Sequence, residues 1–121
     1  MFVYPSTVIE HYKHPRNMGS LHSADGQGYA RAADGCEVRF QVRLSADDRV
    51  EAVRFRSTTC VVAVAACSIL STLSEGRPAR EVAGISADDV ARALGGVPPE
   101  RQSRCEMAVS TLGRALEDAW K

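Results

Sequence analysis

Two stretches of the chain alternate apolar and polar residues with the two-residue period of a half-buried β-strand. In residues 37–44, Glu-Val-Arg-Phe-Gln-Val-Arg-Leu, every second side chain is apolar, and Val-Arg-Phe-Arg repeats the pattern at 53–56. The turn-forming residues Ser-Ala-Asp-Asp at 45–48 lie between them, which predicts a hairpin. A weaker pattern predicts a first strand over 28–33. These segments predict an antiparallel meander of two or three strands with one wet face.

The pattern changes at Cys60, where an unbroken run of mostly small apolar residues begins. The run is too long for one strand, and the Gly and Pro that follow it are helix stop signals. We therefore expect a buried helix over 60–74 that lies across the buried face of the sheet. Thr58 or Thr59 is its expected N-cap.

Three further helices are predicted from capping and stop signals. The first covers residues 5–14, with Ser6 as N-cap and Pro15 as the stop, and a loop over 16–27 follows it.

Two of these helices begin at capping boxes in the last third of the chain. Ser-Ala-Asp-Asp at 86–89 opens a helix that ends at Gly-Gly 95–96, and Val-Pro-Pro at 97–99 follows as an extended loop. Ser-Arg-Cys-Glu at 103–106 opens the last helix, which runs to about Trp120. Its inner face is predicted to carry Val109, Leu112, Leu116 and Trp120.

Length and composition are those of a single globular domain spanning residues 1–121. The chain is 45% hydrophobic, and its 15 Lys and Arg balance 15 Asp and Glu, so its charge favours neither nucleic acid nor an anionic membrane. We recognise no signal peptide and no membrane-spanning run, and therefore expect a cytoplasmic protein with reduced cysteines. The expected fold class is α+β, a small antiparallel three-stranded sheet with helices packed on one face.

Three of the four cysteines lie at predicted element boundaries. Cys36 directly precedes a strand, and Cys60 and Cys105 lie at predicted helix starts, where the helix dipole favours a thiolate. With Asp34, two residues before Cys36, they could hold zinc in a closed tetrahedral site or iron in a cluster. No Cys-x-x-Cys pair is present, so buried structural thiols remain an alternative. Cys67, in the middle of a predicted helix, is expected to have a packing role.

Other catalytic motifs are absent from the sequence. It contains neither Gly-x-Ser-x-Gly nor a phosphate-binding loop. His11 and His14 lie on a short polar helix and are expected to be solvated rather than to bind a metal. A Cys–His catalytic pair would require His11, His14 or His22 to fold over a cysteine, and it is kept as a minor alternative.

Residues 8–19, Val-Ile-Glu-His-Tyr-Lys-His-Pro-Arg-Asn-Met-Gly, resemble the opening signature of the U-type iron–sulfur cluster scaffold family. This family comprises IscU, SufU and the N-terminal domain of NifU. Residues 52–56 followed by Cys60 are similar to its strand before the second cluster cysteine. Cys105 and the helix after it resemble the third, and residues 95–99 resemble the loop before it. The resemblance spans essentially the whole chain.

The resemblance implies that Asp34, Cys36, Cys60 and Cys105 gather at one end of the sheet. There they would receive sulfur from a cysteine desulfurase and hold a transient [2Fe–2S] cluster, or zinc in the protein as purified. The protein would be a scaffold rather than an enzyme and would serve apo iron–sulfur client proteins. The family's sulfur acceptor is often the cysteine that matches Cys105, so Cys105 is the expected persulfide acceptor. We expect its helix start and the neighbouring Arg104 to lower its pKa.

The chain departs from the family pattern around each candidate ligand. Cys-Gly-Asp is replaced by Asp-Gly-Cys at 34–36, and Gly-Cys-Gly by the stiffer Thr-Cys-Val at 59–61. The histidine that often precedes the third cysteine is Arg104. The chaperone-docking motif Leu-Pro-Pro-Val-Lys is Val-Pro-Pro-Glu-Arg at 97–101, whose acidic residue makes docking of that chaperone doubtful.

Three functions remain open from the sequence. The favoured one is a cluster scaffold that uses the three thiols and Asp34, with Asp34 as the weakest ligand. The second is a zinc-binding sulfur acceptor similar to SufU, although the extra segment typical of that branch is missing. The third is an adaptor that keeps the fold without building a cluster. Retention of all three thiols favours the first two, and loss of the glycines and the histidine favours the third.

Overall fold

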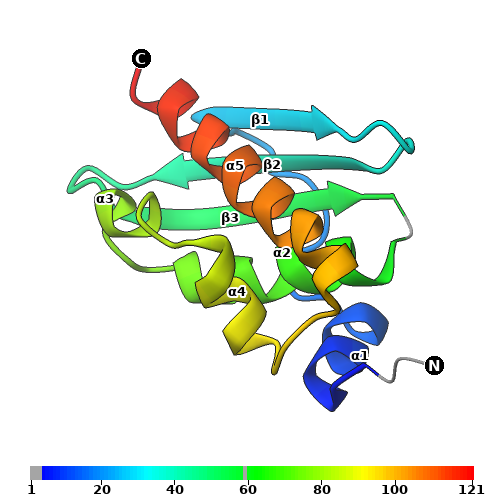
Figure 1. The fold of residues 1–121 in the computed structure, drawn as a ribbon. Helices are drawn as coiled ribbons and strands as arrows, with labels where there is room; N and C mark the ends of the chain where they lie inside the picture. Colours follow the sequence, from blue (N-terminus) through cyan, green and yellow to red (C-terminus); the bar gives the residue numbers. More distant parts are fainter. Residues whose placement is uncertain (1–3, 59) are drawn as a thin grey trace.

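The predicted meander is present as one antiparallel sheet in the order β1-β2-β3 (Figure 1). The structure is a computed structural model that describes residues 4–58 and 60–121. Its strands are β1 (Gly26–Arg31), β2 (Glu37–Leu44) and β3 (Val50–Ser57). Phe40 lies opposite Gly28 on one side and Phe55 on the other, and the two buried phenylalanine rings are 6.0 Å apart. The apolar positions of the alternating pattern therefore form the buried face. β1 begins at Gly26, earlier than the predicted 28.

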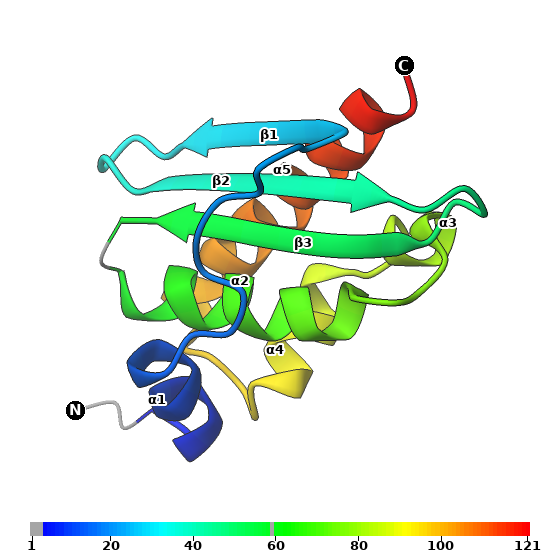
Figure 2. The same ribbon diagram turned by 180° about the vertical axis from the view of Figure 1, so that it is seen from behind.

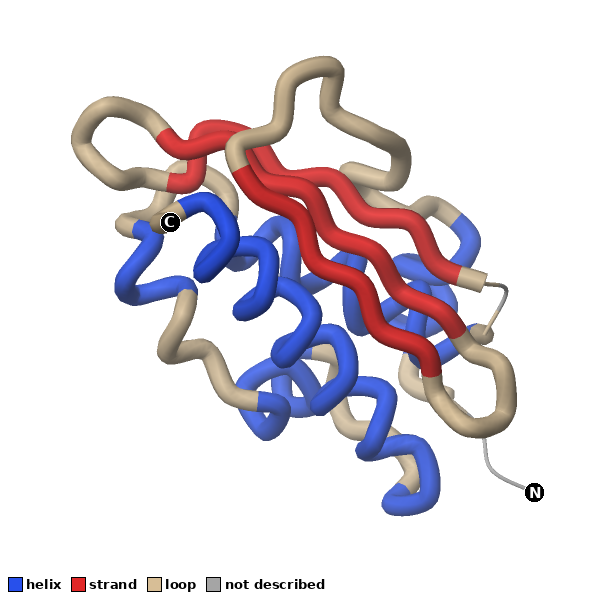
Figure 3. The backbone as a smooth tube through the Cα atoms, turned by 90° about the horizontal axis from the view of Figure 1, so that it is seen from above, coloured by secondary structure: helices blue, strands red, loops and turns tan. Residues whose placement is uncertain are grey.

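The helices cover one face of the sheet, which confirms the predicted α+β class (Figures 1 and 3). The long helices α2 and α5 lie against the sheet, α1 packs on α2, and α4 packs on α5 and α2. Two short elements were not predicted, α3 and the 3-10 turn η1. The bounds are α1 (Ser6–Lys13), α2 (Val61–Ser74), α3 (Ala79–Val82), α4 (Ala87–Ala93), η1 (Pro99–Arg101) and α5 (Gln102–Ala119).

Two glycines of β1 allow α5 to lie directly on the strand. A Cβ atom on Gly26 would stand 2.2 Å from the carbonyl oxygen of Ala115, and one on Gly28 would stand 2.4 Å from that of Thr111. Both distances are shorter than any non-bonded contact, so any side chain at these positions would push the helix away. This close approach explains why β1 lacks the apolar side chains that mark the other strands.

Three of the predicted N-caps are wrong, and one is confirmed. Cys60 itself is the N-cap of α2. Thr58 follows the last residue of β3, and its side chain accepts a 3.1 Å hydrogen bond from the Glu37 N–H, while Thr59 lies outside the described residues. Ser6 is the first residue of α1, after Pro5. Ser103 is the second residue of α5, because η1 leads directly into that helix. The capping box of α4, at Ser86 and Asp89, is present as predicted.

The inner face of α5 is largely as predicted. Leu112 and Leu116 are buried, whereas Val109 and Trp120 are partly buried against the core. Trp120 donates a 2.9 Å hydrogen bond to Asp48 in the turn between β2 and β3, and the guanidinium of Arg80 lies 3.8 Å from the centre of its ring. These contacts join the end of α5 to that turn and to α3.

The segment 11–17 is fastened to α2 by side chains. Nδ1 of His11 lies 2.7 Å from Oγ of Ser68, which also accepts a 2.9 Å hydrogen bond from the Arg16 N–H. The Asn17 amide donates to Oγ of Ser71 over 3.0 Å. Only 8% of the His11 surface is exposed, so the expectation that this histidine is solvated is wrong. Burial, helped by the charge of Arg16, lowers the pKa of His11.

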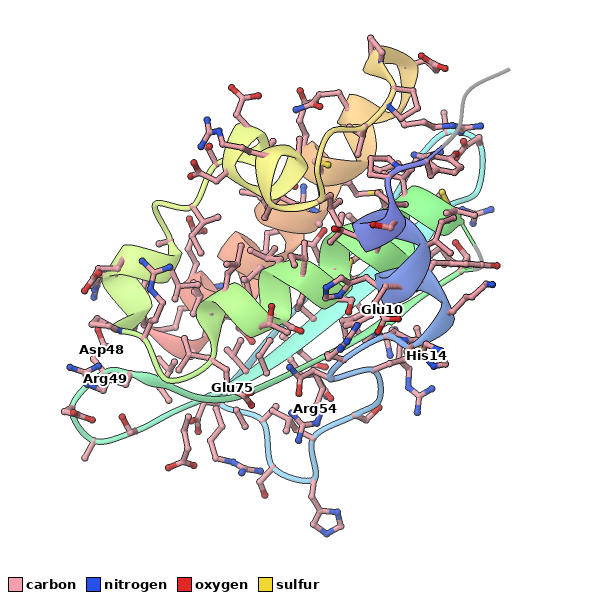
Figure 4. The ribbon with its side chains drawn as sticks, turned by 90° about the horizontal axis from the view of Figure 1, so that it is seen from below. Glu10, His14, Asp48, Arg49, Arg54 and Glu75 are labelled. Atoms are coloured by element: carbon pink, nitrogen blue, oxygen red, sulfur yellow. The ribbon has the colours of Figure 1, made fainter. Side chains whose placement is uncertain are left out.

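The chain then follows the free edge of β3 and crosses the outer face of the sheet. The Phe55 N–H donates to the Asn17 carbonyl over 3.0 Å, and the Gly19 N–H donates to the Phe55 carbonyl over 2.8 Å. Beyond Gly19 the loop runs over the sheet to β1 (Figure 2). The ion pair of Arg54 and Glu75, 3.8 Å long and labelled in Figure 4, joins β3 to the end of α2. No helix among the described residues is both long and apolar enough to cross a membrane.

Candidate functional site

Three segments that are distant in the sequence meet in one pocket at the end of the sheet where β3 leads into α2. The turn between β1 and β2 contributes Asp34 and Cys36, and the start of α2 contributes Cys60. Arg101 and Arg104, from the junction of η1 and α5, complete the polar lining. The structure therefore brings three of the four predicted ligands to one pocket.

The β1–β2 turn holds Asp34 and Cys36 in different environments. Gly35 between them has a φ of +94°, and one carboxylate oxygen of Asp34 accepts a 3.1 Å hydrogen bond from the Cys36 N–H. The Asp34 side chain is 58% exposed, whereas Cys36 is 7% exposed. The segment is thus a tight turn, and both residues line the pocket. The Cys36 N–H and the positive charge of Arg104 hold the pKa of Asp34 below its usual value.

The thiols of Cys36 and Cys60 are neighbours in the pocket. Burial raises the pKa of Cys36, and the nearby sulfur of Cys60 adds to this shift, while a hydrogen bond with the Thr58 side chain opposes it. Cys60 is only partly buried, and its extended backbone, with φ −112° and ψ 122°, precedes the first turn of α2. Of the two thiols, Cys60 is the more accessible from solvent.

Cys105 is not among the described residues that line the pocket. It is completely buried, as the fourth residue of α5. Burial, with a contribution from the charge of Glu106, raises the pKa of Cys105 to about 11. The expectation that its helix start and Arg104 lower this pKa is therefore wrong. Desolvation of the thiolate outweighs the helix dipole, and the charge of Arg104 is directed to Asp34 instead.

Cys67 is also completely buried in the core, which confirms the predicted packing role. Burial raises its pKa well above the usual value, and the three other cysteines lie near enough to contribute. The four thiols therefore occupy one region, with only Cys36 and Cys60 at the pocket surface.

Arg104 is the residue whose role sequence reasoning missed. It is only 7% exposed, and its guanidinium forms an ion pair with the Asp34 carboxylate. Its Nε has no hydrogen-bond partner among the described residues. Burial alone would lower the pKa of Arg104, but the neighbouring Cys36 and Cys60 sulfurs and the Asp34 carboxylate outweigh it and raise that pKa. The only sequence signal was the replacement of the family's histidine by a permanent cation.

The model of the NifU-like N-terminal domain family matches residues 3–120. The chain belongs to this family. It is 42% identical over 119 residues to the bifunctional protein NifU/MnmA of Rubrobacter xylanophilus, covering 97% of this chain but only 24% of that longer protein. It is 30% identical to the iron–sulfur cluster assembly scaffold protein IscU 1 of Archaeoglobus fulgidus, covering 98% of this chain and 78% of that one.

Solved structures show the same fold at low sequence identity. A scaffold protein of the SUF system from Fervidobacterium islandicum, putative in its description, superposes with a TM-score of 0.77 at 16% identity, covering 93% of this chain and 96% of that one. A NifU-like N-terminal protein from Brucella abortus gives 0.75 at 16% identity, covering 94% and 92%. The predicted family and fold are confirmed.

Within this NifU-like domain, the donor types suit zinc or an iron–sulfur cluster, but their arrangement is not that of an assembled site. Thiolates with one carboxylate form a known ligand set for either group. In the described part of the chain, however, no three Cys, His, Asp or Glu side chains are close enough together to hold a metal ion. In this arrangement Asp34 is paired with Arg104, and Cys105 is completely buried.

The histidines do not compensate for the missing ligand. None of them is among the described residues lining the pocket. His11 binds Ser68, and His14 and His22 are exposed elsewhere on the surface. The structure therefore gives no support to a Cys–His catalytic pair.

Proposed function

We propose that this NifU-like domain is an iron–sulfur cluster assembly scaffold that builds a transient [2Fe–2S] cluster in the pocket. The observation that carries the proposal is the convergence of two thiols and a carboxylate in one pocket from distant segments. Packing alone does not require these polar groups at the same surface. Iron and sulfide are the cargo, delivered with the help of a cysteine desulfurase and passed on to apo client proteins. The role is that of a scaffold rather than an enzyme.

Cys36, Cys60 and Asp34 are the ligands already at the pocket, and Cys105 would complete the set. Recruitment of Cys105 requires the start of α5 to shift, because its thiol is buried in the core. Thiolates are the preferred ligands of iron–sulfur clusters, so Asp34 is expected to bind most weakly. In the aerobically purified protein, zinc is expected at the same residues, since it accepts thiolates together with an oxygen ligand.

Anaerobic reconstitution with ferrous iron, cysteine, a cysteine desulfurase and a thiol reductant, which converts the delivered persulfide sulfur to sulfide, tests this function. Wild type should develop the visible absorption of a [2Fe–2S] cluster, and Cys60→Ala should lose it. Cys67→Ala is the matched control, because that thiol lies in the core outside the pocket lining and the variant should retain the cluster. Full cluster formation by Cys60→Ala, or none by wild type, would contradict the proposal.

A second candidate, an adaptor without a cluster, is favoured by the ion pair that occupies Asp34 and by the absence of three assembled donors among the described residues. An adaptor would bind the desulfurase and change its turnover equally in wild type and Cys60→Ala, without visible absorption. The reconstitution experiment therefore distinguishes the two candidates when desulfurase turnover is measured alongside it.

Sulfur transfer to Cys105, expected from the resemblance, remains a prediction. We propose Cys60 as an alternative acceptor, because a desulfurase must deliver its sulfur to a thiol that it can reach. Cys60 is partly exposed at the start of α2, whereas Cys105 is completely buried.

A further inference from the structure

We propose that Arg104 acts as an internal cation that holds Asp34 in the unloaded scaffold and opposes metal binding until it is displaced from that carboxylate. The inference rests on the proposed function, because it concerns the same pocket. It assigns to this chain a residue that restrains loading rather than one that supplies a ligand.

Arg104 is a buried cation in the lining of the pocket. Its side chain is 9% exposed, and it reaches from the start of α5 to a carboxylate that lies 70 positions earlier in the chain. The sulfurs of Cys36 and Cys60 also lie within reach of its charge. The guanidinium thus lies near all three candidate ligands that line the pocket, and it already forms an ion pair with the carboxylate.

Arginine cannot replace a histidine as a metal ligand. A histidine at this position could lose its proton and become a neutral metal ligand. A guanidinium remains charged in proteins, has no acceptor atom and therefore cannot ligate a metal. A divalent ion bound to Asp34 and Cys60 would be repelled by this fixed charge as long as Arg104 remained in place.

While Arg104 is paired with Asp34, not all of its hydrogen-bond donors are satisfied. The Nε atom of Arg104 is buried without a hydrogen-bond partner among the described residues, which costs free energy in the unloaded state. Release of the guanidinium toward solvent would remove that cost. The ion pair between Arg104 and Asp34 therefore opposes metal binding, but it can be broken when a metal is loaded.

Zinc affinity, measured by competition with a chromogenic chelator, tests the proposal. Arg104→Gln removes the charge and keeps a polar side chain of similar reach, and it should bind zinc at least about tenfold more tightly than wild type. Arg101→Gln is the matched control. Arg101 also lines the pocket, but it is exposed, and among the described residues Asp34 pairs with Arg104 instead. Loss of Arg101 should therefore change the zinc affinity less than about threefold.

A double-mutant cycle separates the ion pair from general repulsion. If Arg104 acts by holding Asp34, then the gain from Arg104→Gln should be clearly smaller in an Asp34→Asn background. Equal or weaker zinc binding by Arg104→Gln, or the same gain in both backgrounds, would overturn the proposal. Zinc binding that is undiminished in Cys60→Ala would instead show that the metal binds elsewhere, and both the proposed function and this inference would fail.

Discussion

Cys60 and Cys105 show how the position of a cysteine relative to the start of a helix decides whether its thiol is accessible or buried. Both lie near helix starts in the sequence, yet Cys60 is the cap residue outside the first turn of α2, and Cys105 is the fourth residue inside α5. The cap lies at the end of the sheet, where its side chain lines the pocket. The fourth residue faces the core, where desolvation raises the pKa to about 11.

Persulfide mapping tests this difference. After reaction with a cysteine desulfurase and cysteine, mass spectrometry of wild type should find the added sulfur on Cys60, because that thiol is the accessible one. Cys60→Ser should lose the added sulfur and Cys105→Ser should keep it. The reverse pattern would return the acceptor role to Cys105 and would require α5 to move when the desulfurase binds.

At the scale of elements, the packing of α5 on β1 depends on glycine. Gly28→Ala should lower the free energy of unfolding by about 2–3 kcal/mol, because the added Cβ would overlap the Thr111 carbonyl oxygen and force the helix outward. Gly113→Ala is the control. A Cβ atom there meets nothing within 4 Å, so this helix position should gain up to about 1 kcal/mol. Urea denaturation measures both, and equal effects would contradict the close packing.

The buried His11 of α1, which is hydrogen-bonded to Ser68 of α2, predicts a pH dependence of stability. Burial and Arg16 lower the pKa of His11 in the folded state, so the unfolded chain takes up this proton more readily. Stability should therefore be lost as the pH falls below about 6.5, the unfolded value, toward the lower folded value.

Thermal unfolding at about pH 7.5 and about pH 5.5 measures this effect. His11→Gln should reduce the decrease in Tm between the two conditions, by roughly 3 °C. His14→Gln, which changes an exposed histidine on the turn that ends α1, should retain the wild-type decrease. A decrease that is the same in all three proteins would mean that other groups cause it.

At the scale of the whole molecule, the pocket joins the β1–β2 turn, α2 and α5. A metal bound to Asp34, Cys36 and Cys60 would tie the β1–β2 turn to the start of α2, and it would stabilise the fold by mass action. The aerobically purified protein should contain about one zinc ion per chain, measured by elemental analysis. Removal by a chelator should lower Tm, and Cys60→Ala should contain less zinc. Undiminished zinc in Cys60→Ala would contradict this prediction.

The sequence by itself determined the kind of each major element and the family. Alternation over 37–44, the apolar run after Cys60 and the capping box at Ser86 are local patterns, and the corresponding strand, helix and cap are present. These patterns were sufficient because they depend on residues only a few positions apart. The signature at residues 8–19 identified the family, although the buried hydrogen bond of its His11 with Ser68 was not predicted.

Only the tertiary structure decided which of these residues meet. His11 and Ser68 are 57 positions apart, and Arg104 and Asp34 are 70 positions apart. The burial of Cys105, the close approach of α5 to Gly28 and the ion pair in the pocket all follow from how α5 lies on the sheet. Contacts between distant residues depend on the packing of whole elements. Local periodicity fixes which face of an element is buried and leaves its partners on other elements undetermined.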